Sequence, residues 1–595
     1  MDQRHRRRDL PEFRAHFTRA SVGLLAFFTA YTGVQDVSRS GAPVAAWAAF
    51  GDCWLLLRLT HTRRPTCVAT GTVGRYGRRM AESDIPAAVR AGYAFTGPAL
   101  ELGALVVGDA CDTTAKVRIP LSMVNRHGLV AGATGTGKTK TLQTMAEQLS
   151  ADGVPVFLAD IKGDLSGMAA PGEASDRVTT RAKDIGYDWE PAAFPVEFFA
   201  LGGRGTGVPV RATITAFGPT LLAKVLGLND VQESSLGLVF HFADANALPL
   251  LDLADLRAVI RHLTSPAGAA DLAELGGLSK ATAGVILRKL IAFADAGAED
   301  FFGETEFDTR DFLRVAPDGR GVVSVLELPS LQDRPELFAT FLMWFLADLF
   351  HDLPEIGDVD KPKLVFFFDE AHLLFNDASK EFLAAVTQTV RLIRSKGVGV
   401  FFVTQTPKDV PGDVLAQLGN RVQHALRAYT PDDAKALKAT ASTFPKSGYD
   451  LEEVLTQLGT GEAIVTVLSE RGAPTPVAWT RIPPPRSLMA QVDPAVAQGI
   501  VTASPLAARY GARIDRESAY EMLLAKVAVP PPAPAPAPGR APAPGRAPSR
   551  AQPEDKSFLE RALGSSAVRS ALRSAATAAG REIARSIFGT ARRRR

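Results

Sequence analysis

A glycine-rich segment of the chain has residue types and spacing suited to holding phosphate groups. It consists of Gly132, Ala133, Thr134, Gly135, Thr136, Gly137, Lys138, Thr139 and Lys140. The first eight match the pattern G-x-x-x-x-G-K-[ST], in which backbone N–H groups surround the β-phosphate and the lysine reaches the β and γ oxygens. The threonine hydroxyl holds Mg²⁺. We therefore predict that the segment binds ATP, with Lys138 acting in catalysis and Thr139 as a ligand of Mg²⁺.

A pair of carboxylates follows the apolar run at residues 364–368. At the end of a buried strand beside the loop, Asp369 is suited to hold Mg²⁺, and Glu370 is suited to polarise the attacking water as general base. An apolar strand that ends in Asp-Glu is also an ordinary strand cap when it stands alone. Together with the loop it predicts an ATPase that hydrolyses its nucleotide.

Other polar residues are candidates for the same site. Gln405, which follows the apolar run at residues 398–404, could sense the γ-phosphate or orient water, and its alternative is a turn residue before Pro407. An arginine supplied in trans often completes phosphoryl transfer, and the candidates are Arg394, Arg421 and Arg427, with Arg421 selected as catalytic. For each of them a structural ion pair is the alternative. Asp160, Lys162 and Asp164 suit either the rim of the site or a turn.

The elements that must position these residues are apolar strands that alternate with helices. Strands are expected at residues 128–131, 154–159, 322–328, 364–368, 398–404, 422–429 and 463–468. Helices are expected at 140–149, 338–350 and 380–396. Continuous apolar strands indicate a parallel sheet covered on both faces. We expect an α/β fold, a P-loop NTPase core with a mainly parallel sheet, helices on both faces and an inserted helical subdomain.

The chain divides into eight expected segments. They are an extension at 1–79, a small β element at 80–120, the first part of the ATPase core at 121–217, a helical insertion at 218–300, the second part of the core at 301–490, a helical C-terminal part at 491–526, a Pro/Ala-rich linker at 527–556 and a basic amphipathic tail helix at 557–595. The tail helix could bind a partner, a membrane surface or nucleic acid, and the alternative is that it packs back on its own body or oligomer. We hypothesise that translation starts at Met80, and the alternative is that residues 1–79 form a genuine disordered or membrane-proximal extension.

Charge is distributed unevenly along the 595 residues. Residues 1–79 carry +8 and residues 536–595 carry +9, which leaves −14 for residues 80–535 within a total of +3. A general basic coat for nucleic acid is therefore absent from the body. The three cysteines lack paired spacing, and the apolar runs at 22–34 and 42–59 are too short or interrupted to span a bilayer. We expect a cytoplasmic protein without a transmembrane segment.

The stretches NRHGLVAGATGTGKTKTLQ, DIKGDLSG, FFFDEAHLLF and RLIRSKGVGVFFVTQTPKDVP occur together with FGPTLLAKVLGLNDVQESSLGLVF and LGNRVQHALRAYTPDD. In this combination the chain resembles the HerA/FtsK superfamily of P-loop ATPases, and more closely its YjgR-like branch, from about Gly92 to Pro484 and again in the tail. The resemblance implies a RecA-like core of the additional-strand, catalytic-glutamate type, ATP hydrolysis and a homo-oligomeric, hexameric ring. It also implies DNA translocation by analogy with the motors of the family.

Two functional classes remain open. One is a ring ATPase that moves DNA, and the other is an ATP-driven remodeller or envelope-associated assembly factor that does not act on nucleic acid. The acidic body weakens the first class. The DEAH letters at residues 369–372 suggest superfamily 2 helicases, but the region after Gln405 offers no second RecA-like domain with an arginine-rich motif.

Overall fold

The computed structural model describes residues 84–329, 334–375 and 380–528, all within the unit Arg79–Arg595. The expected extension, most of the linker and the tail helix lie outside these residues, as do both N-terminal apolar runs. None of the helices in the described ranges is both long and apolar enough to cross a membrane.

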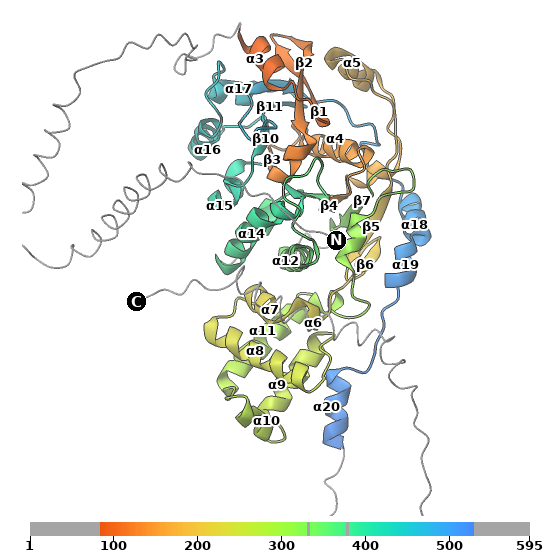
Figure 1. The fold of residues 1–595 in the computed structure, drawn as a ribbon, viewed down its shortest axis with the longest axis vertical. Coiled ribbons are helices and arrows are strands. Elements are labelled where there is room, and N and C mark those ends of the chain that lie inside the picture. Colours follow the sequence, from red (N-terminus) through yellow and green to blue (C-terminus); the bar gives the residue numbers. More distant parts are fainter. Residues whose placement is uncertain (1–83, 330–333, 376–379, 529–595) are drawn as a thin grey trace, which may run out of the picture. The chain divides into compact units, whose positions relative to one another are not determined.

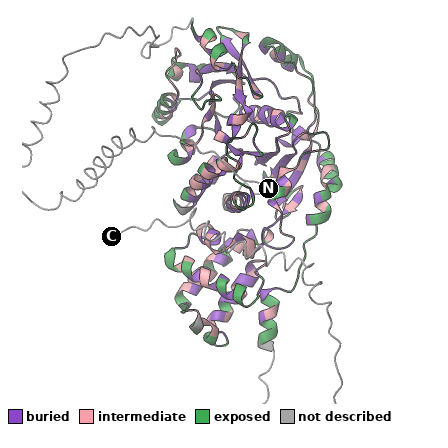
Figure 2. Cartoon of the chain, in the orientation of Figure 1, coloured by how far each residue is buried: buried purple, intermediate pink, exposed green. Residues whose placement is uncertain are grey.

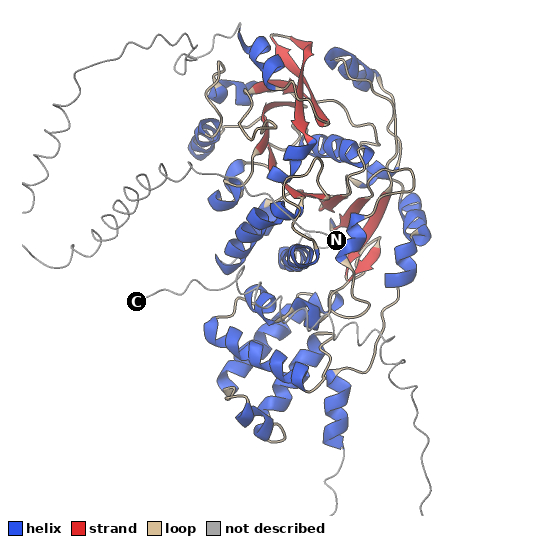
Figure 3. Ribbon diagram, in the orientation of Figure 1, coloured by secondary structure: helices blue, strands red, loops and turns tan. Residues whose placement is uncertain are grey.

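One sheet of twelve strands organises the described chain (Figures 1 and 3). The strands are β1 (Ala99–Val107), β2 (Ala110–Pro120), β3 (Gly128–Ala131), β4 (Val156–Asp160), β5 (Val196–Leu201), β6 (Val208–Val210), β7 (Val323–Glu327), β8 (Leu364–Phe368), β9 (Val398–Thr404), β10 (Asn420–His424), β11 (Glu462–Thr466) and β12 (Ala478–Arg481). Their order is β2-β1-β12-β11-β10-β3-β9-β8-β4-β7-β5-β6. Pairing is parallel from β10 to β6 and antiparallel from β2 to β10. The expected mainly parallel sheet is confirmed, and the small β element at its N-terminal side continues the same sheet.

The order of the central strands brings the chemical groups together. β9 lies between β3, which leads into the glycine-rich loop, and β8, which leads into Asp369 and Glu370. All three strands are parallel, so their carboxyl ends meet at one edge of the sheet. This additional strand between loop and carboxylates is the arrangement that the resemblance implied.

Helices cover both faces of the sheet. They are α3 (Ile85–Gly92), α4 (Lys138–Ala151), α5 (Asp176–Ile185), α6 (Ile214–Phe217), α7 (Pro219–Val225), α8 (Asp230–Ala245), α9 (Leu253–Thr264), α10 (Ala269–Glu274), α11 (Lys280–Asp295), α12 (Pro335–Asp352), α13 (His372–Phe375), α14 (Lys380–Ile393), α15 (Gly412–Leu415), α16 (Pro431–Ser442), α17 (Leu451–Gln457), α18 (Pro494–Ala503), α19 (Pro505–Tyr510) and α20 (Ala519–Ala528). Alternate residues of the strands enter two separate cores: Leu129 packs with α12 and α14, and Val130 packs with α4. Figure 2 shows the strands buried and the outer helical surfaces exposed.

The expected helical insertion corresponds to α7–α11. Its apolar residues, such as Leu222, Val259 and Ile286, belong to the same core as α12 and α14. The insertion therefore folds onto one face of the sheet and shares its apolar core. In the C-terminal part, the backbone N–H of Tyr520 on α20 donates to Asp255 on α9 at 2.9 Å.

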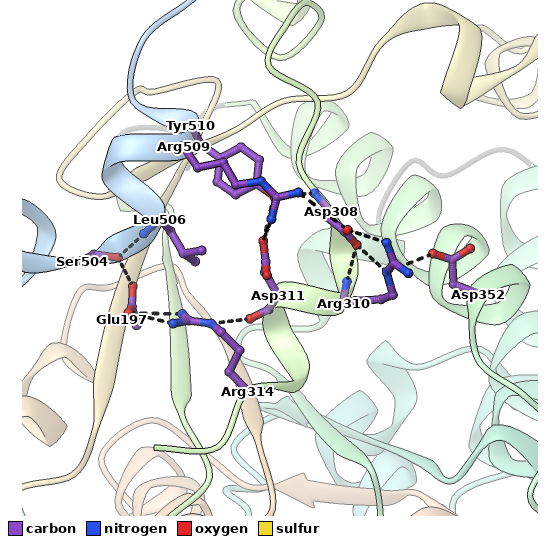
Figure 4. A network of polar contacts seen from close by, with 10 residues as sticks. All are labelled: Glu197, Asp308, Arg310, Asp311, Arg314, Asp352, Ser504, Leu506, Arg509 and Tyr510. Carbon is purple, nitrogen blue, oxygen red and sulfur yellow. Dashed lines mark hydrogen bonds and ion pairs between the residues drawn. The ribbon is translucent and has the colours of Figure 1, made fainter. Parts of the chain in front are cut away.

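A network of charged and polar side chains fixes α18–α19 to the far end of the sheet (Figure 4). The Glu197 carboxylate on β5 accepts from Ser504 Oγ at 2.6 Å and from Arg314 Nη1 at 3.2 Å. The Tyr510 hydroxyl donates to Asp311 at 2.7 Å. Glu197 is also the polar residue that interrupts the apolar sequence of β5, which was not expected as a strand.

Several strands differ from the expectations. β2 lies within the small β element expected at 80–120, whereas β5, β6 and β12 were not predicted, because they are short or carry polar residues that break the apolar run. The strand expected at 422–429 is observed at Asn420–His424. It ends there because the carbonyl of Ala425 accepts from Ala133 of the loop at 2.8 Å, and Leu426 donates to the carbonyl of Leu455.

Candidate active site

The glycine-rich loop leaves the sheet at the carboxyl end of β3, held by backbone hydrogen bonds from both sides. Gly132 donates to the carbonyl of Thr404 on β9 at 3.2 Å, and Ala133 donates to the carbonyl of Ala425 after β10 at 2.8 Å. Gly132 lies at φ +155°, and a Cβ there would come 2.5 Å from His424 Cβ. A glycine is therefore required at this position, where the loop passes directly against its neighbour strand.

The loop ends at the start of α4 in a form that suits an anion. Gly137, at φ +113°, precedes the first residue of α4, and within the described chain no side chain caps this helix. The N–H groups of the first turn thus remain available at the positive end of the helix dipole. Lys138 is largely buried, and its Nζ donates to the carbonyl of Ala133 at 3.2 Å across the loop. Phosphate groups fit this cradle of N–H donors and a lysine.

Asp369 provides the feature that fits a divalent cation. It follows β8, is 1% exposed, and uses one carboxylate oxygen, Oδ1, to accept from the backbone N–H of Glu370 at 2.9 Å. Its other oxygen, Oδ2, is buried without a hydrogen-bond partner in the described structure. Burial, assisted by the charge of Glu370, raises the pKa of Asp369 to about 7. A buried carboxylate oxygen with no partner is costly unless a cation compensates it, so Mg²⁺ fits here.

Glu370 has an environment different from that of its neighbour. Its backbone lies at φ +46°, a conformation that non-glycine residues rarely adopt and that is typical of functional sites. Burial raises the pKa of its carboxyl, but the hydrogen bond and charge of Lys162 outweigh burial, and the net pKa is lowered. His372 Nδ1 lies 3.3 Å from Glu370 Oε2. An ionised, oriented carboxylate at this position can accept a proton from water.

Gln405 follows the carboxyl end of β9, between the loop strand and the strand of the carboxylates. Its side chain is exposed, whereas that of the preceding Thr404 is buried and donates to Asp409 at 2.8 Å. Asp409 also accepts from the N–H of Thr406 at 3.0 Å and so stabilises the turn. The turn thus presents Gln405 at the edge of the sheet where the loop and Glu370 lie. Its role as a sensor stays a prediction.

Two of the three candidate arginines lie near the amino ends of the strands, and the third follows a carboxyl end. Arg394 precedes β9 and Arg421 is near the amino end of β10, so both are away from the loop of their own chain. Arg421 is partly buried, and its Nη2 donates to the carbonyl of Leu415 at 3.4 Å. Arg427 follows the carboxyl end of β10, is exposed, and contacts the 80% exposed Tyr429. A role in trans stays a prediction for each of them.

The remaining expected residues have defined positions. Thr139 is the second residue of α4 and is partly exposed. Lys140 Nζ donates to the carbonyl of Met489 at 2.8 Å and to Gln143 at 3.0 Å, which joins α4 to the segment before α18. Asp160 is fully buried and accepts from the N–H groups of Gly163 and Leu165, so the turn interpretation applies to it. Lys162, in contrast, reaches the site.

His424 is a residue of the site that sequence reasoning missed. Its ring is buried behind the loop, with Nε2 2.9 Å from Thr141 Oγ1 on α4 and Nδ1 2.8 Å from the carbonyl of Glu462. Gly461 donates from the same segment to the carbonyl of Thr136 at 2.8 Å. These contacts support the loop from β10 and β11. A histidine at the end of a strand that is mostly polar in sequence carries no sequence signal for this role.

The neutral, buried histidines predict a pH dependence of stability. Burial lowers the pKa of His127 and of His424 to about 4, so both are uncharged in the folded protein at neutral pH. The unfolded chain takes up these protons near the ordinary pKa of about 6.5, so the contribution of these two histidines to the free energy of unfolding falls as the pH decreases from about 6.5 to 4. Each histidine contributes at most about 1.4 kcal/mol per pH unit. His424→Gln is expected to reduce the slope of the free energy of unfolding against pH, measured by denaturant titrations at several pH values. Replacement of the exposed His351 by glutamine should retain the wild-type slope. An unchanged slope in His424→Gln contradicts the prediction.

Comparisons with known proteins found one matching family model, several related sequences and several similar folds. Residues 107–595 match the family model described as Helicase HerA-like C-terminal. The chain is 30% identical over 153 residues to the probable helicase MJECL08 of Methanocaldococcus jannaschii, covering 24% of this chain and 28% of that protein. It is 22% identical over 374 residues to the DNA double-strand break repair helicase HerA of Sulfurisphaera tokodaii, covering 61% and 66%. The chain thus spans less than two thirds of the length of these relatives.

Among solved structures, the bacterial conjugative coupling protein TrwBdeltaN70 matches with a TM-score of 0.44 and 16% identity, over 71% of this chain and 96% of that one.

Proposed function

Because the chain belongs to the helicase HerA-like C-terminal family, we propose that it is an ATP-hydrolysing motor ATPase that acts on DNA. The observation that carries the proposal is the convergence of the glycine-rich loop, the buried Asp369 and the strained Glu370 at one edge of the sheet, with β9 between their strands. The relative named as a DNA repair helicase supports DNA as the substrate.

Each residue of the site has a part in the proposed reaction. The N–H groups of the loop and Lys138 bind the phosphates, and Thr139 and Asp369 would hold Mg²⁺, which supplies charge neutralisation when bound. Glu370 accepts the proton of the attacking water, and Gln405 orients that water. An arginine of a neighbouring copy in a homo-oligomeric ring, a hexamer in the proposal, would complete the site. We also propose a cytoplasmic location for the protein, because ATP is available there as the substrate.

Steady-state ATP hydrolysis by the full chain tests the proposal, with and without single- and double-stranded DNA. The expected result is hydrolysis that Lys138→Ala abolishes and that DNA stimulates several-fold in the wild type. Absence of hydrolysis in the wild type would overturn the ATPase proposal.

Analytical sedimentation of the wild type with nucleotide tests the proposed ring. A monomer in all conditions would contradict it.

The second candidate is an ATP-driven remodeller or assembly factor that acts on protein. The observation that favours it is the net charge of −14 in residues 80–535, which contain the whole described site. Proteins bind DNA largely through basic side chains that contact its phosphates, and an acidic body disfavours such contacts. If residues 80–535 do bind DNA, the binding should weaken as the salt concentration rises. This candidate is selected if Lys138→Ala abolishes ATP hydrolysis and neither single- nor double-stranded DNA alters the rate of the wild type.

A further inference from the structure

Lys162 enters the candidate active site from a strand that contributes no residue to the sequence motifs of the loop or the carboxylate pair. β4 is the parallel neighbour of β8, with Ala159 level with Phe368, so the chain leaves both strands at the same edge. Lys162 lies two residues beyond β4, and Glu370 lies two residues beyond β8. The Lys162 ammonium donates to Glu370 Oε1. Its side chain is 44% exposed, whereas that of Glu370 is 7% exposed.

The backbone that carries Lys162 is held firmly. The buried carboxylate of Asp160 accepts from Gly163 at 2.7 Å and from Leu165 at 2.8 Å. Gln491, from the segment before α18, donates from Nε2 to the carbonyl of Lys162 at 3.2 Å. Movement at this position is therefore left to the flexible four-carbon side chain, which is partly exposed and has rotatable N–H donors that can reach a new acceptor.

The charges round Lys162 are those of the phosphate site. Lys162 and Lys138 are close enough to repel each other, and both are attracted to Asp369 and Glu370. The terminal phosphate of a nucleoside triphosphate seated on the loop would enter this group of charges. A terminal phosphate carries more negative charge than one carboxylate and offers three acceptor oxygens, so it competes with Glu370 for the ammonium. A nucleoside diphosphate lacks this group and leaves the Lys162–Glu370 pair in place.

We propose that Lys162 distinguishes nucleoside triphosphates from diphosphates by transferring its ammonium from Glu370 to the terminal phosphate. The same movement releases Glu370 Oε1 from its hydrogen bond with Lys162. The Glu370 carboxylate can therefore act as general base only when a nucleoside triphosphate is bound. Lys162 acts here as a specificity-determining and positioning residue. The inference rests on the proposed ATPase site and assigns within it a residue outside both motifs.

The test measures nucleotide binding to the full chain, with Mg²⁺, by calorimetry. The probes are ADP and a non-hydrolysable ATP analogue, and the variants are Lys162→Gln, Lys162→Arg and Lys361→Gln. Lys361 is the matched control, since its ammonium donates to the carbonyl of Asp152 near the amino end of β8, away from the site. Lys162→Gln is expected to weaken the analogue about tenfold, as for loss of one charge-assisted hydrogen bond, and to leave ADP binding unchanged. Lys162→Arg should restore much of the preference, and Lys361→Gln should behave as the wild type.

Unchanged ADP binding also reports that the variant is folded, so a lost preference cannot come from a damaged site. Equal weakening of ADP and the analogue, or no weakening of either, would overturn the role of Lys162. If the wild type binds and hydrolyses ATP in that case, the proposed function stands and only this inference fails. A wild type that binds neither nucleotide rejects the proposed site and the inference together.

Discussion

Replacing Glu370 with glutamine is expected to reduce ATP hydrolysis by about 10²–10⁴-fold, the usual effect of losing a general base. The amide cannot accept a proton from water, yet it has nearly the same shape as the carboxylate. Nucleotide binding depends on the loop and Lys138, and should be retained. Steady-state hydrolysis and the Kd of a non-hydrolysable ATP analogue measure the two effects separately.

Glu327→Gln is the matched control for this substitution. Glu327 lies at the carboxyl end of β7, level with Asp160 on β4, and burial also raises the pKa of its carboxyl. Because it lies one strand further from β8 than Asp160 does, its replacement should leave the rate of hydrolysis near that of the wild type. If Glu370→Gln hydrolyses ATP at the wild-type rate, another group is the base.

Replacing Phe157 with alanine is expected to lower the free energy of unfolding by about 3–5 kcal/mol, because it removes a large buried side chain and leaves a cavity. Phe157 on β4 is fully buried, with its ring centroid 5.2 Å from that of Phe312, 5.0 Å from Phe345 and 5.3 Å from Phe366. These rings join the sheet, α12 and the segment before β7. Guanidinium unfolding followed by tryptophan fluorescence measures the change.

Two substitutions define the scale of this effect. Phe157→Leu keeps most of the volume and should cost less than about 1.5 kcal/mol. Val231→Ala on α8, where the residue is 64% exposed, should change stability by no more than about 0.5 kcal/mol. A loss in Phe157→Ala no larger than that in Val231→Ala would show that the aromatic cluster is not a cooperative part of the core.

The sequence was sufficient for the central strands and the residues that follow them. β3, β8 and β9 were expected with their observed bounds, because each is buried on both faces and is therefore apolar throughout. The pattern of the loop and the Asp369-Glu370 pair depend on local chemistry, which neighbouring residues in the chain encode directly. The helical insertion was likewise visible through its helical periodicity.

The tertiary structure decided which distant residues act on the site. Lys162 and Glu370 are 208 positions apart, and His424 and Thr141 are 283 apart. Strand order, which no local pattern encodes, brings both pairs together. The structure also gave Asp369 a buried oxygen without a partner and gave Glu370 a lysine partner, so adjacent carboxylates acquire opposite pKa shifts. Motifs therefore follow from short-range sequence, whereas electrostatics and supporting contacts follow from long-range packing, because they depend on what surrounds each group in space.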